Sequence, residues 1–154
     1  MTTMQARRPI APIRLVLGTI ALMQALPFWL VALTVRVALG EVFWSSAQEH
    51  LSNWDTTLYQ FEESFQVPLL PPDLAANMAV AIELGAPPLL LLGLGTRFAA
   101  LVLLGMTAVI EIFVFPMAWP THIQWAGLEL LLITQGAGAL SLDHLIRRRC
   151  APEG

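Results

Sequence analysis

The stretch LAANMAVAIELGAPPLLLLGLGTRFAALVLLGMTAVIEIFVFPM, residues 74–117, decides the fold. It holds two apolar runs, 74–94 and 97–117, and each has about the 20 residues that an α-helix needs to cross a bilayer core. Only Gly95 and Thr96 separate the two runs, so the connection between them is very tight. The stretch therefore predicts two antiparallel helices that span a membrane.

The apolar region before this stretch is longer than one crossing requires. Residues 15–47 would make about 50 Å of helix at ~1.5 Å per residue, which exceeds one ~30 Å crossing but is too short for two crossings and a turn. Pro27 lies near the middle, where a proline breaks or kinks a helix. We therefore expect an interfacial or lead-in helix over 12–25 and the first span over 27–47. A first span over 15–35 is the alternative.

The composition of the whole chain agrees with a membrane protein. Of its 154 residues, 56% are hydrophobic and 12% are charged, whereas a soluble domain carries about 25% charged residues. This excludes a water-soluble globular enzyme, a nucleic-acid binder and a disordered tail. We predict an all-α protein, a bundle of four transmembrane helices with the extra N-terminal helix. The spans are expected at 27–47, 74–94, 97–117 and 122–141.

The arginines predict the orientation of the bundle. With four spans, seven of the eight arginines lie on one side, in the N-terminal segment 1–14, the turn at 95–97 and the tail 147–154. The polar loop 48–72 holds no arginine and lies on the other side. By the positive-inside rule, both termini of a multi-pass domain over 15–146 are expected on the cytoplasmic side, and the acidic loop on the periplasmic or extracellular side.

Several ionisable residues fall inside the predicted spans, and each costs roughly 2.5–3.5 kcal/mol at mid-membrane. They are Arg36, Glu41, Glu83, Glu111 and Glu129. We interpret them as a functional or structural polar core, in which an Arg36–Glu83 pair that only holds two helices in register is the structural alternative. Arg36 needs a partner because it stays protonated, and Glu83 lies at a matching depth. One arginine cannot neutralise four carboxylates, so at least one of them is protonated or meets a ligand, a proton path or a metal.

Two further groups of residues are candidates for binding. The spacing allows His122, Glu111 and Glu129 to converge in an outward-opening pocket, where imidazole and carboxylate suit proton handling or a divalent metal; His122 as an ordinary interfacial residue is the alternative. In the loop, apolar residues at helical spacing, among them Phe61 and Phe65, predict an amphipathic helix on the membrane. The loop also carries acidic residues that suit docking of a protein partner: Glu49, Asp55, Glu62 and Glu63.

The order of segments resembles the DoxX family of small four-helix bacterial membrane proteins. The matching segments are RVALGEVFWSSAQEHL (36–51), PLLPPDLAA (68–76), ELGAPPLLLLGLGTRFAALVLLGMT (83–107), FPMAWPTH (115–122) and GAGALSLDHL (136–145). The most specific parts are GLGTRFAAL and SLDHL. The resemblance places Arg36 within the first span and makes Glu83 the matching acidic residue of the second. Many family members have a lysine where this chain has Gln48 or Glu49.

The resemblance implies several activities, because the family is named after a subunit of a thiosulfate:quinone oxidoreductase. Other members are linked to oxidative-stress complexes, to maturation of a periplasmic amine dehydrogenase or to copper-stress gene clusters. The first hypothesis is a quinone-linked redox subunit or accessory protein. In it, Arg36 and Glu83 polarise or protonate the quinone, and Glu111 and Glu129 relay protons. If the chain is part of an enzyme, it is then a subunit of a quinone-linked oxidoreductase.

Two other hypotheses remain open beside the first. One is a non-enzymatic scaffold or assembly factor whose acidic loop docks a periplasmic partner. The other is a small metal or ion transporter built on His122, Glu111 and Glu129, which would require a homodimer because four spans are few for a transporter. No motif for a bound redox cofactor is visible, so in the first hypothesis, which the resemblance implies, the electrons are carried by a quinone and not by the protein.

Overall fold

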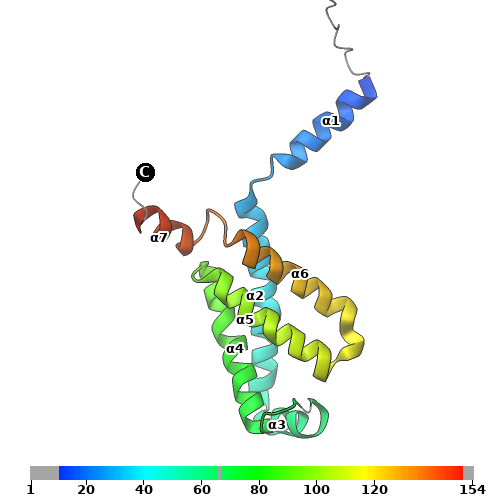
Figure 1. Cartoon of the computed structure of the whole chain (residues 1–154), viewed down its shortest axis with the longest axis vertical. Helices are drawn as coiled ribbons and strands as arrows, with labels where there is room; N and C mark the ends of the chain where they lie inside the picture. The colour runs from blue at the N-terminus through cyan, green and yellow to red at the C-terminus, as the bar shows by residue number, and fades with distance from the viewer. Residues whose placement is uncertain (1–10, 66, 151–154) are drawn as a thin grey trace, which may run out of the picture.

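A computed structural model describes residues 11–65 and 67–150 of the chain, and all regular structure in these residues is helical (Figure 1). The elements in chain order are α1 (Ala11–Gln24), α2 (Phe28–Ser52), α3 (Trp54–Gln60), the π-helical turn η1 (Phe61–Phe65), α4 (Pro72–Leu92), α5 (Thr96–Val109), the π-helical turn η2 (Ile110–Val114), the 3-10 turn η3 (Pro116–Ala118), α6 (Trp119–Gln135) and α7 (Leu142–Cys150). The prediction of an all-α protein is confirmed. Arg7 and Arg8, two of the arginines from which the orientation is predicted, lie outside the described residues.

Three of these helices are long and apolar enough to cross a membrane: α2, α4, and α5 continued by η2 (Thr96–Val114). The shorter α6, with 17 residues, packs along α5 as the fourth helix of the bundle. It ends at Gln135, before the end of the predicted span 122–141, because Gly136 turns the chain with a φ of 81°. The chain is therefore a multi-pass membrane protein in contact with lipid.

Pro27 breaks the first apolar region instead of only bending it. Residues 25–27 are not helical, and Pro27 is extended with φ −70° and ψ 135°. A proline has no N–H to donate, and it disfavours the helical conformation in the residue before it. As a result α1 runs away from the bundle as a separate lead-in helix (Figure 1), and α2 continues five residues beyond the predicted end at 47.

The bundle consists of two helix pairs. Helix α2 packs most extensively on α4, and α5 on α6. Fully buried leucines and aromatic residues from all four helices fill the space between the pairs. They include Leu39, Phe43, Leu90, Leu103 and Leu132. Burial of each such side chain contributes about 1.5–3 kcal/mol in water, and inside a bilayer close packing contributes instead.

The polar loop folds back on the bundle. Phe61 is buried against Ala75 and Ala76 of α4, and Phe65 packs beside it. The prediction that the apolar face of this amphipathic helix lies on the membrane was therefore wrong. The helix exists as α3 and η1, but its apolar side chains cover the start of α4, which offers only small side chains there and so leaves room for the rings.

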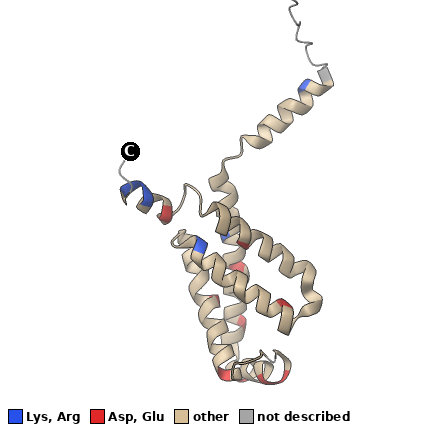
Figure 2. Ribbon diagram, in the orientation of Figure 1, with Lys and Arg blue, Asp and Glu red and all other residues tan. Residues whose placement is uncertain are grey.

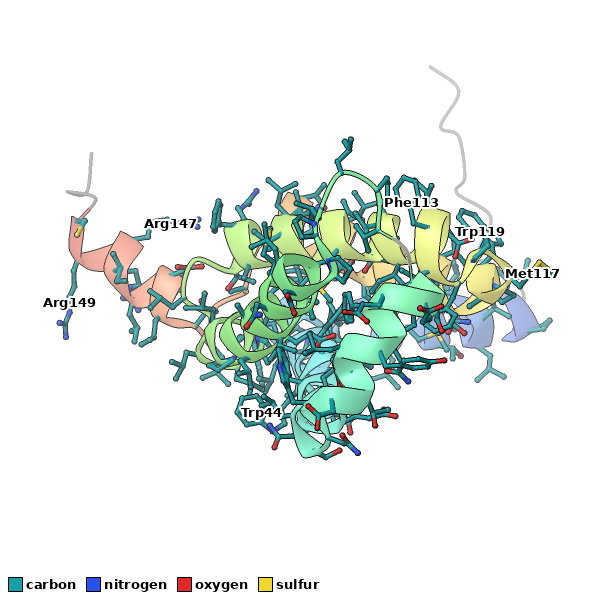
Figure 3. The ribbon with its side chains drawn as sticks, turned by 90° about the horizontal axis from the view of Figure 1, so that it is seen from below. Trp44, Phe113, Met117, Trp119, Arg147 and Arg149 are labelled. Carbon is teal, nitrogen blue, oxygen red and sulfur yellow. The ribbon has the colours of Figure 1, made fainter. Side chains whose placement is uncertain are left out.

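The charges separate along the bundle (Figure 2). We call the end with the α4–α5 turn (93–95) and α7 the arginine end, and the end with α3 and η3 the loop end. Figure 3 shows Arg147 and Arg149 on α7 at the first of these. At the α5–α6 turn of the loop end, Phe113, Met117 and Trp119 are exposed (Figure 3). Exposed apolar and aromatic side chains at this level fit a membrane interface.

A set of hydrogen bonds closes the arginine end. The Asp143 carboxylate accepts the N–H groups of Gly95 at 2.8 Å and Thr96 at 3.0 Å, and the Asp143 N–H donates to the Gly93 carbonyl at 2.9 Å. Gly93 has a φ of 66°, and a Cβ atom there would lie 2.5 Å from the Ser141 Cβ. We call residues 93–96 together with 141–143 the latch. These are the glycine-rich turn and the SLD sequence of the two most specific motifs.

Candidate functional site

Arg36 is 1% exposed, and its partners are backbone carbonyls. The guanidinium donates to the carbonyls of Leu90 at 2.6 Å and Leu91 at 2.5 Å, at the end of α4. It also donates to the carbonyls of Ala137 at 3.1 Å and Leu140 at 2.7 Å, in the segment after α6. Arg36 thereby joins three parts of the chain at the arginine end.

The predicted pairing of Arg36 with Glu83 was therefore wrong. The last carbonyls of a helix have no partner within the helix and carry the negative end of its dipole, so they attract a cation. Arg36 lies at the level of the last turn of α4, whereas Glu83 lies near the middle of that helix. The guanidinium is satisfied without a carboxylate, and Glu83 is left for other partners.

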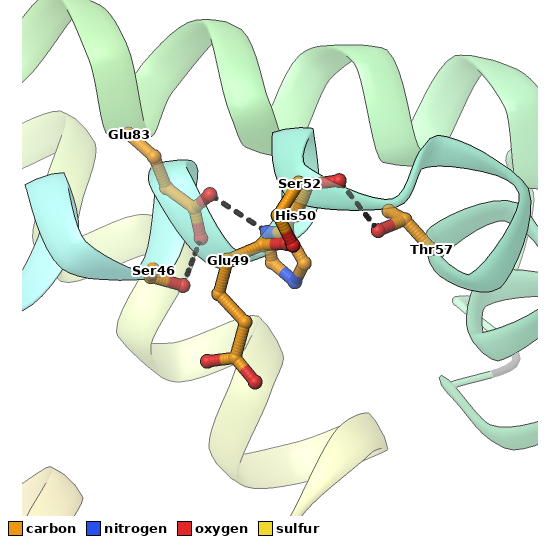
Figure 4. A network of polar contacts seen from close by, with 6 residues as sticks. All are labelled: Ser46, Glu49, His50, Ser52, Thr57 and Glu83. Carbon is orange, nitrogen blue, oxygen red and sulfur yellow. Dashed lines mark hydrogen bonds and ion pairs between the residues drawn. The ribbon is translucent and has the colours of Figure 1, made fainter.

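Glu83 is held by two side chains of α2 (Figure 4). The Ser46 hydroxyl donates to one carboxylate oxygen at 2.8 Å, and His50 Nδ1 lies 2.9 Å from the other. Glu83 is 2% exposed and the His50 side chain is 16% exposed, so the carboxylate is buried and the imidazole is partly buried. Thr57 donates its hydroxyl to the His50 carbonyl at 2.8 Å and so fixes the end of α2 (Figure 4).

Sequence reasoning did not identify His50 as a site residue. Position 50 fell in the predicted loop 48–72, but α2 continues through it to Ser52. The sequence contains a signal that the helix continues to position 50. Residues at helical spacing share one face of α2 there, namely Phe43, Ser46, Ala47 and His50. Extending the helix by one turn would have placed His50 on the buried face.

A second pair joins Glu111 to His122. Glu111 belongs to η2 and His122 to the first turns of α6, and Glu111 Oε2 lies 2.6 Å from His122 Nδ1. His122 is 5% exposed and its ring packs against Trp125 at a centroid distance of 5.1 Å. The structure therefore brings together two of the three residues of the predicted pocket.

Glu129 does not join this pair. It follows His122 by seven residues, about 10 Å along a helix, which is too far for one metal ion to bridge. Glu129 is 0% exposed; one of its oxygens accepts the Thr107 hydroxyl at 3.0 Å and the other has no partner among the described residues. Within residues 11–65 and 67–150, no three histidine, cysteine or acidic side chains could hold a metal ion. The predicted metal site is therefore not assembled.

Glu41 points away from the bundle. It is exposed on the outer face of α2, and the Ser45 hydroxyl donates to it at 3.0 Å. The buried face of α2 carries Arg36, Leu39 and Phe43, and Glu41 lies off that face by its helical spacing. Of the five predicted core residues, Glu41 is thus the one that does not face the interior.

The acidic residues of the loop gather at the loop end. Glu49 lies in the last turn of α2, Asp55 lies in the first turn of α3, and Glu62 and Glu63 lie in η1. All four side chains are exposed. They form an acidic surface at the end of the bundle opposite the arginines.

A cavity of about 550 Å³ lies between the two helix pairs. Its polar lining includes Ser46, His50, Glu83 and His122, so the His50–Glu83 pair and the imidazole of His122 border it. The rest of the wall is mainly apolar and rich in aromatic rings, namely Phe43, Phe61, Phe65, Phe115 and Trp125. A mostly apolar cavity with a few convergent polar groups is the usual form of a small-molecule site.

The rings of the wall touch one another. Phe61 and Phe65 have centroids 5.0 Å apart, and Phe65 and Phe115 have centroids 5.4 Å apart, both edge to face. Phe43 and Trp125 lie 5.7 Å apart. Such contacts stiffen the side chains that surround the cavity.

A smaller cavity of about 210 Å³ lies between α5 with η2 and the first part of α6, toward the loop end. Glu111, Thr107 and Trp119 line it, together with His122. His122 therefore borders both cavities, and its partner Glu111 borders only the smaller one.

Comparison with known proteins gives a family and a relative. The DoxX family model matches residues 31–116, from α2 through η2. An uncharacterized protein of Haemophilus influenzae is 31% identical over 120 residues, which cover 68% of this chain and 78% of that protein. No solved structure matches the chain. The matched region contains Arg36, both carboxylates of the His–Glu pairs, and His50.

Proposed function

Because the chain belongs to the DoxX family of membrane proteins, we propose that it serves a quinone-linked redox system, as a membrane subunit or accessory protein that binds the quinone between its helix pairs. The observation that carries this proposal is the cavity of about 550 Å³ with the buried Glu83 carboxylate and its partner His50 in its wall. In the same proposal the membrane is the bacterial inner membrane, and the arginine end faces the cytoplasm.

The chemistry of the wall suits a quinone. Aromatic rings from α2, η1 and α6 offer faces and edges to a flat ring, and the apolar wall accepts an isoprenoid tail. When bound, the quinone would supply the redox chemistry through two electrons and two protons, which this chain does not carry itself. The donor set therefore fits the group, since it combines an apolar cavity with polar groups for the ring oxygens.

His50 is the residue that we assign to the ring oxygen. Glu83 holds its Nδ1, and among the described residues nothing is hydrogen-bonded to its Nε2. Nε2 can accept a hydrogen bond from a hydroxyl when the imidazole is neutral, and donate one to a carbonyl when the imidazole is protonated. The carboxylate orients the ring and stabilises the protonated form. The pair can thus hold a proton beside the ligand.

Quinone binding to the purified protein in lipid nanodiscs tests the proposal. Equilibrium dialysis with 2-methyl-1,4-naphthoquinone should show saturable binding. Glu83→Gln and His50→Phe should each weaken it about tenfold, the loss of one hydrogen bond with a charged partner. The matched controls are Glu41→Gln, which changes a carboxylate outside the cavity, and His144→Phe, which changes the histidine of α7. No binding, or equal weakening in the controls, contradicts the proposal.

A second candidate function rests on the acidic surface at the loop end. Four exposed acidic side chains without an arginine in their segment suit a basic partner protein, as in the scaffold hypothesis. Deleting the loop would disturb the bundle, because Thr57 and Phe61 are buried in it. The variant Asp55→Asn/Glu62→Gln instead removes charge only. It should release a partner that co-purifies with the wild type in mild detergent; unchanged co-purification would count against docking here.

A further inference from the structure

One His–Glu pair lies in each of the two helix pairs of the bundle. His50 and Glu83 join α2 to α4, and Glu111 and His122 join η2 to α6. Each pair therefore connects the two helices of one helix pair. Both imidazoles border the same cavity, although one comes from the first helix of the bundle and the other from the last.

The second pair has the same local arrangement as the first. Its carboxylate also contacts Nδ1 of the imidazole, and among the described residues no hydrogen bond is made to Nε2 of His122. Glu111 lies on a π-helical turn, where one extra residue per turn changes the direction of the side chains. Such turns occur often at functional sites, because the helix gives up regular hydrogen bonds to form them. The π-helical turn that continues α5 therefore sets the direction of the Glu111 side chain, which contacts His122.

We propose that His122 is a second polar anchor of the cavity, so that the site selects a flat ring with oxygens on two opposite edges. This inference rests on the proposed function, because it assigns the second oxygen of the quinone. One oxygen meets the His50–Glu83 pair and the other meets the His122–Glu111 pair. The ring between them lies among the aromatic side chains that line the cavity. A ring with a single oxygen satisfies only one of the two pairs.

Competition between two matched ligands tests the proposal. 2-Methyl-1,4-naphthoquinone has two carbonyls, and 2-methyl-1-tetralone has a ring system of similar size with one. The wild type in nanodiscs should bind the dicarbonyl ligand about tenfold more tightly, the effect of one further hydrogen bond with a charged partner. In His122→Phe this preference should disappear, while the monocarbonyl ligand should bind within about twofold of the wild type because His50 still holds it.

A second variant and a control keep the test decisive. Phenylalanine at position 122 keeps a ring beside Trp125, and helical content and gel filtration check the fold. If that variant does not fold, Glu111→Gln replaces it, since the amide oxygen still accepts from the imidazole while the charge is removed. His144→Phe should keep the full preference.

The outcomes separate the two proposals. Equal binding of both ligands by the wild type overturns the second anchor and leaves the quinone site in place. A preference that survives in His122→Phe, or in Glu111→Gln where that variant replaces it, has the same meaning. Loss of binding of both ligands in the wild type overturns the quinone site and the inference together.

Discussion

Replacing Arg36 by methionine tests whether this residue holds the bundle together or acts on a ligand. Methionine keeps most of the length of the side chain and removes all hydrogen-bond donors. The structure places Arg36 outside the lining of the cavity and in contact with four carbonyl oxygens. We therefore expect a large loss of stability and an unchanged affinity for quinone in the folded protein.

The size of the loss follows from the contacts. A hydrogen bond to a charged group contributes about 1.5–3 kcal/mol. The bonds to the carbonyls of Leu90 and Ala137 are buried, and together they make about 3–6 kcal/mol on that basis. The bonds to Leu91 and Leu140 are only partly buried, and we take them to offset the desolvation of the guanidinium. The expected decrease in the free energy of unfolding is thus about 3–6 kcal/mol.

Unfolding by SDS in mixed micelles, followed by tryptophan fluorescence, measures this decrease. Arg36→Lys should recover about half of it, because one ammonium cannot reach both the end of α4 and the segment after α6. Arg97→Met is the matched control; Arg97 is exposed and donates to the Ile133 carbonyl at 2.7 Å, so about 1 kcal/mol or less is expected. A loss below about 1 kcal/mol in Arg36→Met would refute the structural role.

Three further stability measurements by the same method probe the latch and Glu129. Asp143→Ala should lower the free energy of unfolding by about 1 kcal/mol, since the N–H groups of Gly95 and Thr96 at the start of α5 lose their acceptor, and a value equal to the wild type would contradict this. Gly93→Ala should be destabilising both by its positive φ and by the clash with Ser141; adding Ser141→Gly should recover only part, and full recovery would exclude backbone strain. Glu129→Met should change stability by less than about 1 kcal/mol or increase it, because a buried oxygen without a partner is removed; a large loss would show a hidden partner.

Local features of the fold were predictable from the sequence. The length and tight spacing of the apolar runs predict the α4–α5 hairpin. In a bilayer, an apolar segment must form a helix because only then are its backbone N–H and C=O groups hydrogen-bonded. Pro27 predicts a helix boundary because it lacks an N–H, and the structure has α1 and α2 meet there. The end of α6 at Gly136 is harder to predict, since glycine also occurs inside membrane helices.

The site was less predictable, because its contacts are made between distant parts of the chain. Depth counting matched Arg36 with Glu83 but could not show that backbone carbonyls 54 to 104 residues away would satisfy the guanidinium. Carbonyls are present at every residue, so no sequence pattern identifies them as partners. Glu111 and His122 were grouped correctly because a short turn separates their helices. His50 was missed because the helix end was placed too early.

The contacts of Arg36 and the latch also set an order for synthesis in the membrane. Arg36 is made 101 residues before Ala137, an interval of about 5–20 s at 5–20 residues per second. During this interval the guanidinium lacks two of its acceptors, and the N–H groups at the start of α5 lack Asp143. Completion of the bundle therefore coincides with the arrival of residues 137–143. A chain that stops before Ala137 would lack these hydrogen bonds at the arginine end, whereas a fusion after Cys150 would leave them intact.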